Sequence, residues 1–114
     1  MLYLKFYTNM FVGRGFAGTT YGPFIFIRPE YRDDKGLLEH EKVHVKQFWR
    51  SLGLHGIFYN LSKKYRFKCE VEAYRKQLEY VEWGVEPIRR KFAEFIANKY
   101  NLNVSVDEAY EKLK

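Results

Sequence analysis

Two histidines and a glutamate fall within five residues in the stretch 37-LLEHEKVHVKQFWR-50. His40, Glu41 and His44 match the pattern H-E-x-x-H. On an α-helix, residues four positions apart lie on one face, so both imidazoles can reach a single metal ion. Glu41 follows the first histidine, where its carboxylate can contact a water molecule on the metal without binding the metal itself. The spacing therefore predicts a site for one Zn2+ ion, with His40 and His44 as ligands and Glu41 as a general base.

A catalytic zinc ion needs a third protein ligand. In proteins with the longer pattern H-E-x-x-H-x-x-G-x-x-H this ligand is the last histidine. Here Gln47 stands at the position of the glycine and Arg50 at that of the histidine, which excludes that class. His55 lies in an expected turn and is a weaker candidate. The better candidates are Glu70 and Glu72, which lie on a second helical stretch.

Helical phase distinguishes these two glutamates. The residues that share a face with Glu70 are mostly small or apolar: Ala73, Tyr74, Gln77 and Val81. The residues that share a face with Glu72 are charged: Arg75, Lys76 and Glu79. A carboxylate that points into a packed interior is costly unless it is paired or binds a metal. The pattern favours Glu70 as the third ligand, and Glu72 stays open as the alternative.

The elements that must hold these residues indicate an α+β fold. Residues 2–8 and 23–28 are rich in aromatic and β-branched side chains and are predicted strands, and the glycine-rich stretch 13–22 has room for a third. A helix is predicted from Leu37 to Gly53, with Asp34 as its cap. We expect a small three-stranded antiparallel sheet packed on this active-site helix, with the remaining helices on the same side.

Four further segments complete the expected architecture. Residues 55–64 form a short helix or an irregular stretch, and 67–82 form the helix that carries the glutamates. Residues 88–100 form a third helix after the break at Gly84 and Pro87. Residues 105–114 form a terminal helix, because Ser105 and Glu108 have the spacing of a capping box.

The composition bounds the class of protein. A chain of 114 residues is long enough for one core, so we expect a single domain over 1–114. The formal net charge of +6 permits binding to an acidic surface but identifies none. Cys69 is the only cysteine, which excludes a disulfide framework. No run approaches the roughly 20 apolar residues of a membrane span and no signal peptide is recognised, so we expect a soluble cytoplasmic protein without a membrane partner.

The two motifs together resemble the gluzincin metallopeptidases, in which H-E-x-x-H is followed on a later helix by a glutamate ligand. The pair 40-HEKVH-44 and 70-EVEAY-74 is similar to this arrangement, and the small size is closest to the minigluzincins of the proabylysin and projannalysin type. The resemblance implies a zinc endopeptidase that acts on polypeptides through water activated by the metal and Glu41. Tyr74 stands where larger gluzincins carry an acidic residue.

The resemblance carries three further expectations. It implies that residues 23–28 line the cleft and pair with an extended substrate. It implies that a tyrosine helps to hold the oxyanion, for which Tyr59, Tyr65 and Tyr74 are candidates. It also implies a latent form in which residues 102–114, with their acidic side chains, act as an inhibitory tail in the cleft; a plain capping helix is the alternative.

Two other functions compete with the peptidase. Basic residues interleaved with aromatic ones could form a nucleic-acid-binding module: Lys63, Lys64, Arg66, Lys68, Arg89, Arg90 and Lys91. Such residues are usually solvated helix faces, and no nucleic-acid motif is present, so we do not expect nucleic acid as the partner. The third function is a zinc-binding scaffold without catalysis. The sequence leaves the oligomeric state open, and a homo-oligomer is compatible with it.

Overall fold

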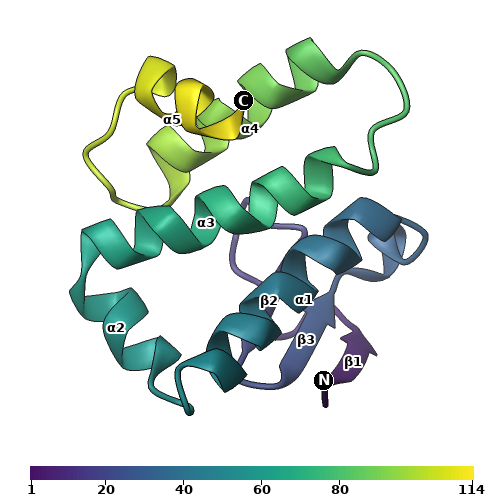
Figure 1. The fold of residues 1–114 in the computed structure, drawn as a ribbon. Helices are drawn as coiled ribbons and strands as arrows, with labels where there is room; N and C mark the ends of the chain where they lie inside the picture. The colour runs from purple at the N-terminus through teal and green to yellow at the C-terminus, as the bar shows by residue number, and fades with distance from the viewer.

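The computed structural model describes residues 1–114 and shows an α+β fold (Figure 1). The strands are β1 (Leu4–Tyr7), β2 (Gly18–Tyr21) and β3 (Phe24–Ile27), followed by a 3-10 helix, η1 (Pro29–Tyr31). The α-helices are α1 (Lys35–Arg50), α2 (His55–Leu61), α3 (Lys63–Leu78), α4 (Val85–Lys99) and α5 (Val106–Leu113). No helix has the length and apolar character needed to cross a bilayer.

The sheet is mixed, so the prediction of a purely antiparallel sheet is wrong. Its strand order is β1-β3-β2. A tight turn at Gly22, whose φ is +58°, joins β2 and β3 as an antiparallel hairpin. The long connection over residues 8–17 leaves room beside β1, and β3 folds back into that space parallel to β1. Strand patterns specify direction and burial but not this spatial order, which is why the sequence did not reveal it.

Helix α1 covers one face of the sheet. Ile25 and Ile27 of β3 are fully buried and pack with Leu37 and Val45 of α1. The alternation of side chains along β3 therefore fixes which face α1 occupies.

Three helices begin earlier than their apolar pattern suggested. Helix α4 begins at Val85 and not at residue 88, because Pro87 lies in its first turn, where the amide hydrogen that proline lacks is not needed. Aspartate and serine side chains cap the other two helices. The Asp34 carboxylate accepts a hydrogen bond from the Leu37 amide at 3.0 Å, which confirms the predicted cap of α1. The Ser62 hydroxyl accepts one from the Tyr65 amide at 3.1 Å, so α3 begins at Lys63 and not at residue 67. The short helix α2 occupies most of the stretch 55–64.

A second core joins the last three helices. It consists of buried residues from α3, α4, the following turn and α5: Tyr74, Leu78, Phe92, Ala93, Ile96, Leu102, Ala109 and Leu113. Figure 1 shows α3 crossing the middle of the molecule, with α1 and the sheet on one side and α4 and α5 on the other. Helix α3 therefore belongs to both halves of the fold.

Residues 102–114 are part of this second core. Leu102, Ala109 and Leu113 are buried in it, and Ser105 caps α5 by accepting a hydrogen bond from the Glu108 amide at 3.0 Å. The capping-box start of α5 is confirmed on the serine side. The segment expected to act as an inhibitory tail thus closes the helical core in this conformation.

Shortening the side chain of Leu113 is expected to destabilise the whole domain. Leu113→Ala removes a buried side chain and should lower the free energy of unfolding by about 2–5 kcal/mol. The exposed Glu111→Ala in the same helix should change it by less than about 0.5 kcal/mol. Chemical denaturation of both variants measures the difference. Equal stability of the two variants would show that α5 does not contribute to the core.

Candidate metal centre

Three predicted ligands meet where α1 crosses α3. The Nε2 atoms of His40 and His44 lie 3.5 and 3.2 Å from the two carboxylate oxygens of Glu70. One ligand atom from each residue lies within 4.8 Å of the other two. All three residues are buried, with exposed fractions of 4%, 8% and 2%. This buried group could hold a metal ion.

Small residues allow the two helices to approach at this point. Ala73 of α3 is fully buried one turn after Glu70. Near the start of α1, a Cβ atom at Gly36 would lie 3.3 Å from Gln77 Cγ of α3 and from Tyr80 Cβ just after α3. A side chain at Gly36 would therefore require these neighbours to shift.

One unsatisfied polar atom of the site fits a cation. Glu70 Oε1, which lies 3.5 Å from His40 Nε2, is buried and has no hydrogen-bond partner. A buried carboxylate oxygen without a donor is costly, and a metal ion would remove that cost. Two imidazole nitrogens and one carboxylate oxygen also form a common ligand set of catalytic zinc sites. The residues present therefore fit a zinc ion, although other divalent ions share these ligands.

The two candidate glutamates lie in different surroundings. Glu72 is partly exposed, forms an ion pair with Arg50 at 2.9 Å and accepts a hydrogen bond from Gln47 at 3.0 Å. His55, the weaker candidate, has its Nδ1 atom 2.9 Å from the Tyr65 hydroxyl and is not part of the buried trio. The structure thus brings Glu70 to the histidines, in agreement with the helical phase, and keeps Glu72 outside the trio.

Burial and charge set the protonation of the trio. Burial alone would lower the pKa of His44, but Glu70 outweighs it and raises that pKa to about 9. Burial alone would raise the pKa of Glu70, but the histidines hold it below its usual range. Without a metal, His44 is therefore a cation at neutral pH. The charged His44 stabilises the fold fully below its unfolded pKa of 6.5, and this stabilisation is lost as pH rises through about 9. The Glu70 carboxylate stabilises the fold fully above its unfolded pKa of 4.5, and this stabilisation is lost as pH falls through its lowered pKa.

Gln47 decides which nitrogen of His44 faces the metal position. The Gln47 side chain is 1% exposed, and its amide nitrogen donates to the Cys69 carbonyl at 3.1 Å and to Glu72 at 3.0 Å. Its amide oxygen must therefore accept from His44 Nδ1, 2.8 Å away. His44 keeps the proton on Nδ1, and Nε2 is the nitrogen that can bind a metal. The sequence prediction used Gln47 only to exclude the class with the longer H-E-x-x-H-x-x-G-x-x-H pattern, in which this position is glycine. Its place three residues after His44 on the buried face was a usable signal.

Strand β2 holds the predicted base. The Thr20 hydroxyl donates to Glu41 Oε1 at 2.7 Å and lies 3.2 Å from the Glu41 carbonyl oxygen. Glu41 Oε2 is 4.0 Å from His40 Nε2, on the side of the metal position. A Cβ atom at Gly18 would lie 3.4 Å from this same oxygen, so glycine leaves space next to it. Neither Thr20 nor Gly18 was identified from the sequence, because nothing in the motif specifies which strand lies beside Glu41.

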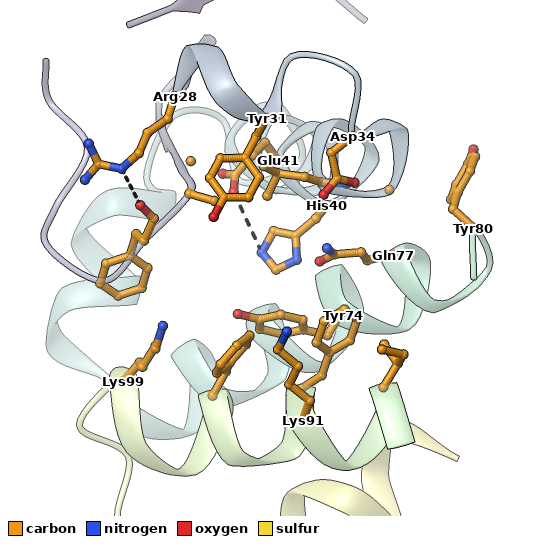
Figure 2. A pocket seen from close by; sticks show the side chains of 18 of the residues that line it. Arg28, Tyr31, Asp34, His40, Glu41, Tyr74, Gln77, Tyr80, Lys91 and Lys99 are labelled. Atoms are coloured by element: carbon orange, nitrogen blue, oxygen red, sulfur yellow. Dashed lines mark hydrogen bonds and ion pairs between the residues drawn. The ribbon is translucent and has the colours of Figure 1, made fainter. Parts of the chain in front are cut away.

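A cleft of about 680 Å3 opens onto His40 and Glu41 (Figure 2). Residues 15–18, η1 and the start of α1 line one side, and α3 and α4 line the other, where Lys91 and Lys99 lie. The ring of Tyr74 packs edge-on against His40 with 4.3 Å between ring centroids. No residue of α5 lines this cleft.

The candidate tyrosines have other partners. The Tyr59 hydroxyl donates to Glu70 Oε2, the Tyr65 hydroxyl pairs with His55, and the Tyr74 hydroxyl pairs with that of Tyr100 at 2.8 Å. Of these three candidates, only Tyr74 lines the cleft. Tyr31 of η1, which the sequence did not single out, also lines it and points into it on the side of Glu41 (Figure 2).

The strand expected to pair with substrate is not available for pairing. Strand β3, within residues 23–28, is hydrogen-bonded to β1 on one side and to β2 on the other along its whole length. The expectation that it pairs with a substrate is therefore wrong, because both of its edges are occupied. Strand β2 is the edge strand beside the cleft.

Comparisons with protein-family models, with curated proteins and with solved structures found no match to this chain. The resemblance to gluzincins therefore rests on the motifs and their arrangement alone.

Metal binding should depend on Glu70 and not on Glu72. We expect the wild-type protein to take up one Zn2+ per chain and the variants His40→Ala, His44→Ala and Glu70→Ala to lose this uptake. The matched variant Glu72→Gln should keep it, because Glu72 lies outside the trio. Metal analysis after dialysis against zinc measures the ratio. Undiminished zinc in Glu70→Ala would reject the ligand set.

Gln47 should influence both zinc affinity and proton release. Gln47→Leu is expected to weaken zinc binding about 10–100-fold, because His44 Nδ1 loses its acceptor. At neutral pH, below the His44 pKa of about 9, wild-type binding should release a proton from Nε2. Calorimetry in buffers of different ionisation enthalpy reports both quantities. Lys46→Leu, on the exposed side of the same turn, is the control. An affinity loss as large in the control would contradict the role of Gln47.

Proposed function

We propose that this protein is a zinc-dependent endopeptidase in which Glu41 is the general base. The observation that carries the proposal is the convergence of His40, His44 and Glu70, with Glu41 beside them. Of these residues, His40 and Glu41 line an open cleft. Structural zinc sites are closed by four protein ligands, whereas this group supplies three and leaves room for water or substrate.

Glu41 suits the role of general base, and Thr20 suits the role of the residue that orients it. Zn2+ in such a site acts as a Lewis acid that acidifies water and polarises a carbonyl group. Glu41 Oε2 would accept a proton from water and later return it to the leaving amine. Thr20 occupies the other oxygen, Oε1, and so keeps Oε2 directed toward the metal position. The Tyr31 hydroxyl in the cleft is a donor available to the substrate carbonyl.

Polypeptide substrates in an extended conformation suit the free edge of β2. The Arg28 amide donates to the Ala17 carbonyl at 2.9 Å, and antiparallel pairing alternates along the strand. The main-chain groups of Gly18 and Thr20 therefore point away from β3 and could pair with a peptide. Because these same two residues adjoin Glu41, a peptide bound on this edge would lie next to the base.

Three other expectations from the sequence bear on this proposal. Inhibition by residues 102–114 stays a prediction, and it would require this segment to leave the helical core. The basic residues suggested for nucleic acid are partly engaged: Arg66 donates to three main-chain oxygens, Arg89 pairs with Glu86, and Arg90 pairs with Asp107. A zinc scaffold without catalysis differs from the peptidase only in activity.

Replacing the base should separate catalysis from metal binding. Glu41→Gln is expected to keep one Zn2+ per chain and to lower the hydrolysis of a casein-like substrate about 10²–10⁴-fold, because only the proton acceptor is lost. Glu39→Gln, two residues before Glu41 on the same helix and paired with Lys42, is the matched control and should retain activity. Zinc-loaded wild-type protein without hydrolysis would favour the scaffold, and full activity in Glu41→Gln would reject the role of this residue.

A further inference from the structure

One continuous stretch of the chain carries only positive charge. Residues 42–69 contain no aspartate and no glutamate but seven basic residues: Lys42, Lys46, Arg50, Lys63, Lys64, Arg66 and Lys68. Arg50 is paired with Glu72, and Arg66 is engaged by main-chain oxygens. The lysines at 46, 63, 64 and 68 are exposed and have no acidic partner. The stretch spans the end of α1, all of α2 and the start of α3, so the charge lies at one end of the fold.

The same stretch exposes large apolar side chains. Helix α2 buries none of its residues. Leu52 is 90% exposed and Leu61 is 82% exposed, and the others are between 45% and 56% exposed: Trp49, Leu54, Ile57 and Phe58. Scattered apolar residues are normal on a surface, but six in thirteen positions are not. We call these six residues the α2 platform.

A hydrogen bond and the arrangement of the chain place the α2 platform at one end of the molecule. The Trp49 indole nitrogen donates to the Leu2 carbonyl at 2.9 Å, which brings the exposed Leu2 to the same end. In Figure 1 the N-terminus, the end of α1 and the turn before α2 lie along one edge of the molecule. Leu52 in this turn has φ +56° because it ends α1: its amide donates to the Trp49 carbonyl at 3.1 Å, and the next amide, of Gly53, donates to the Phe48 carbonyl at 2.9 Å. This backbone leaves the Leu52 side chain 90% exposed.

We propose that the α2 platform docks the protein on an anionic lipid surface. Leucine, isoleucine, phenylalanine and tryptophan at a protruding end, flanked by lysines without acidic neighbours, are what an interfacial segment needs. The apolar side chains would enter the headgroup region, and the lysines would lie against lipid phosphates. Docking of this kind needs no membrane-spanning helix, so it is compatible with the absence of one. It differs from the sequence-based expectation that the protein has no membrane partner, and the vesicle experiment below distinguishes the two.

The charge and shape of the platform disfavour other occupants. A second copy would bring the same unpaired lysines against each other. Nucleic acid would use stacking aromatic rings, whereas most of the platform is aliphatic. No residue of the α2 platform lines the cleft, so a partner protein bound to the platform would not be held by the cleft. The proposal also uses no metal ligand and stands or falls separately from the proposed peptidase activity.

Vesicle flotation tests the docking directly. The full-length protein should float with vesicles of phosphatidylcholine containing phosphatidylglycerol and remain unbound with phosphatidylcholine alone. Raising the ionic strength from about 0.1 to about 1 M shortens the Debye length from about 10 to about 3 Å and should weaken binding. Binding that is equal on both kinds of vesicle, or no binding to either, would overturn the proposal.

Variants then assign the binding to the α2 platform. Leu52→Glu combined with Leu61→Glu should lower partitioning at least about tenfold per residue. Lys63→Ala combined with Lys64→Ala should lower it about 25-fold, or about fivefold per lysine. All four side chains are exposed, and circular dichroism verifies that the variants are folded.

Matched controls lie on other parts of the surface. Trp83→Glu changes an 84% exposed side chain between α3 and α4, and Lys112→Ala removes a charge from α5; both should bind as the wild type does. Equal loss in these controls would overturn the assignment to the α2 platform. Retention of single-stranded DNA binding in the leucine variant, with loss in the lysine variant and no vesicle binding, would show a nucleic-acid surface in its place.

Discussion

The burial of the Glu70 carboxylate is the constraint on which the arrangement of α1, α2 and α3 depends. Its oxygen Oε2 meets His44 from α1 and accepts from Tyr59 of α2, while Oε1 lies near His40 without a hydrogen bond. Helix α2 buries no side chain, so this hydrogen bond and the contact of Arg66 with the Tyr59 carbonyl are polar anchors that hold it. A single buried charge on α3 therefore brings three helices together, because α1 and α2 each supply a group that lowers the cost of burying it.

The helices and the sheet position different residues of the site. The helices bring the three candidate ligands together, whereas the edge strand β2 holds Glu41 through Thr20 and makes space for it at Gly18. The proposed base, Glu41, is thus supported by a different layer of the fold from the candidate ligands. This division explains why α1, which carries both kinds of residue, packs on the sheet with one face and on α3 with another.

The sequence predicted those features of the site and the fold that depend on residues close together in the chain. Spacing along one helix identified His40 and His44, and the phase of the second helix distinguished Glu70 from Glu72. The Asp34 and Ser105 caps were recognised because capping depends on three or four neighbouring residues. Thr20 contacts Glu41 from 21 positions away in the sequence. Strand β1 pairs with β3 although β2 lies between them in the sequence. Such contacts depend on how layers assemble, and no periodicity in the chain encodes them.

If the buried trio holds a metal ion, the unpartnered Glu70 Oε1 makes the stability of the folded state depend on the supply of that ion. An ion that binds only the folded chain adds to its stability in proportion to the logarithm of free ion over dissociation constant, about 2.7 kcal/mol at a hundredfold excess. A metal-starved cell would therefore hold a larger unfolded fraction of this small domain, and proteases act on that fraction. The half-life of the protein, and not only its activity, would then follow the free concentration of the ion.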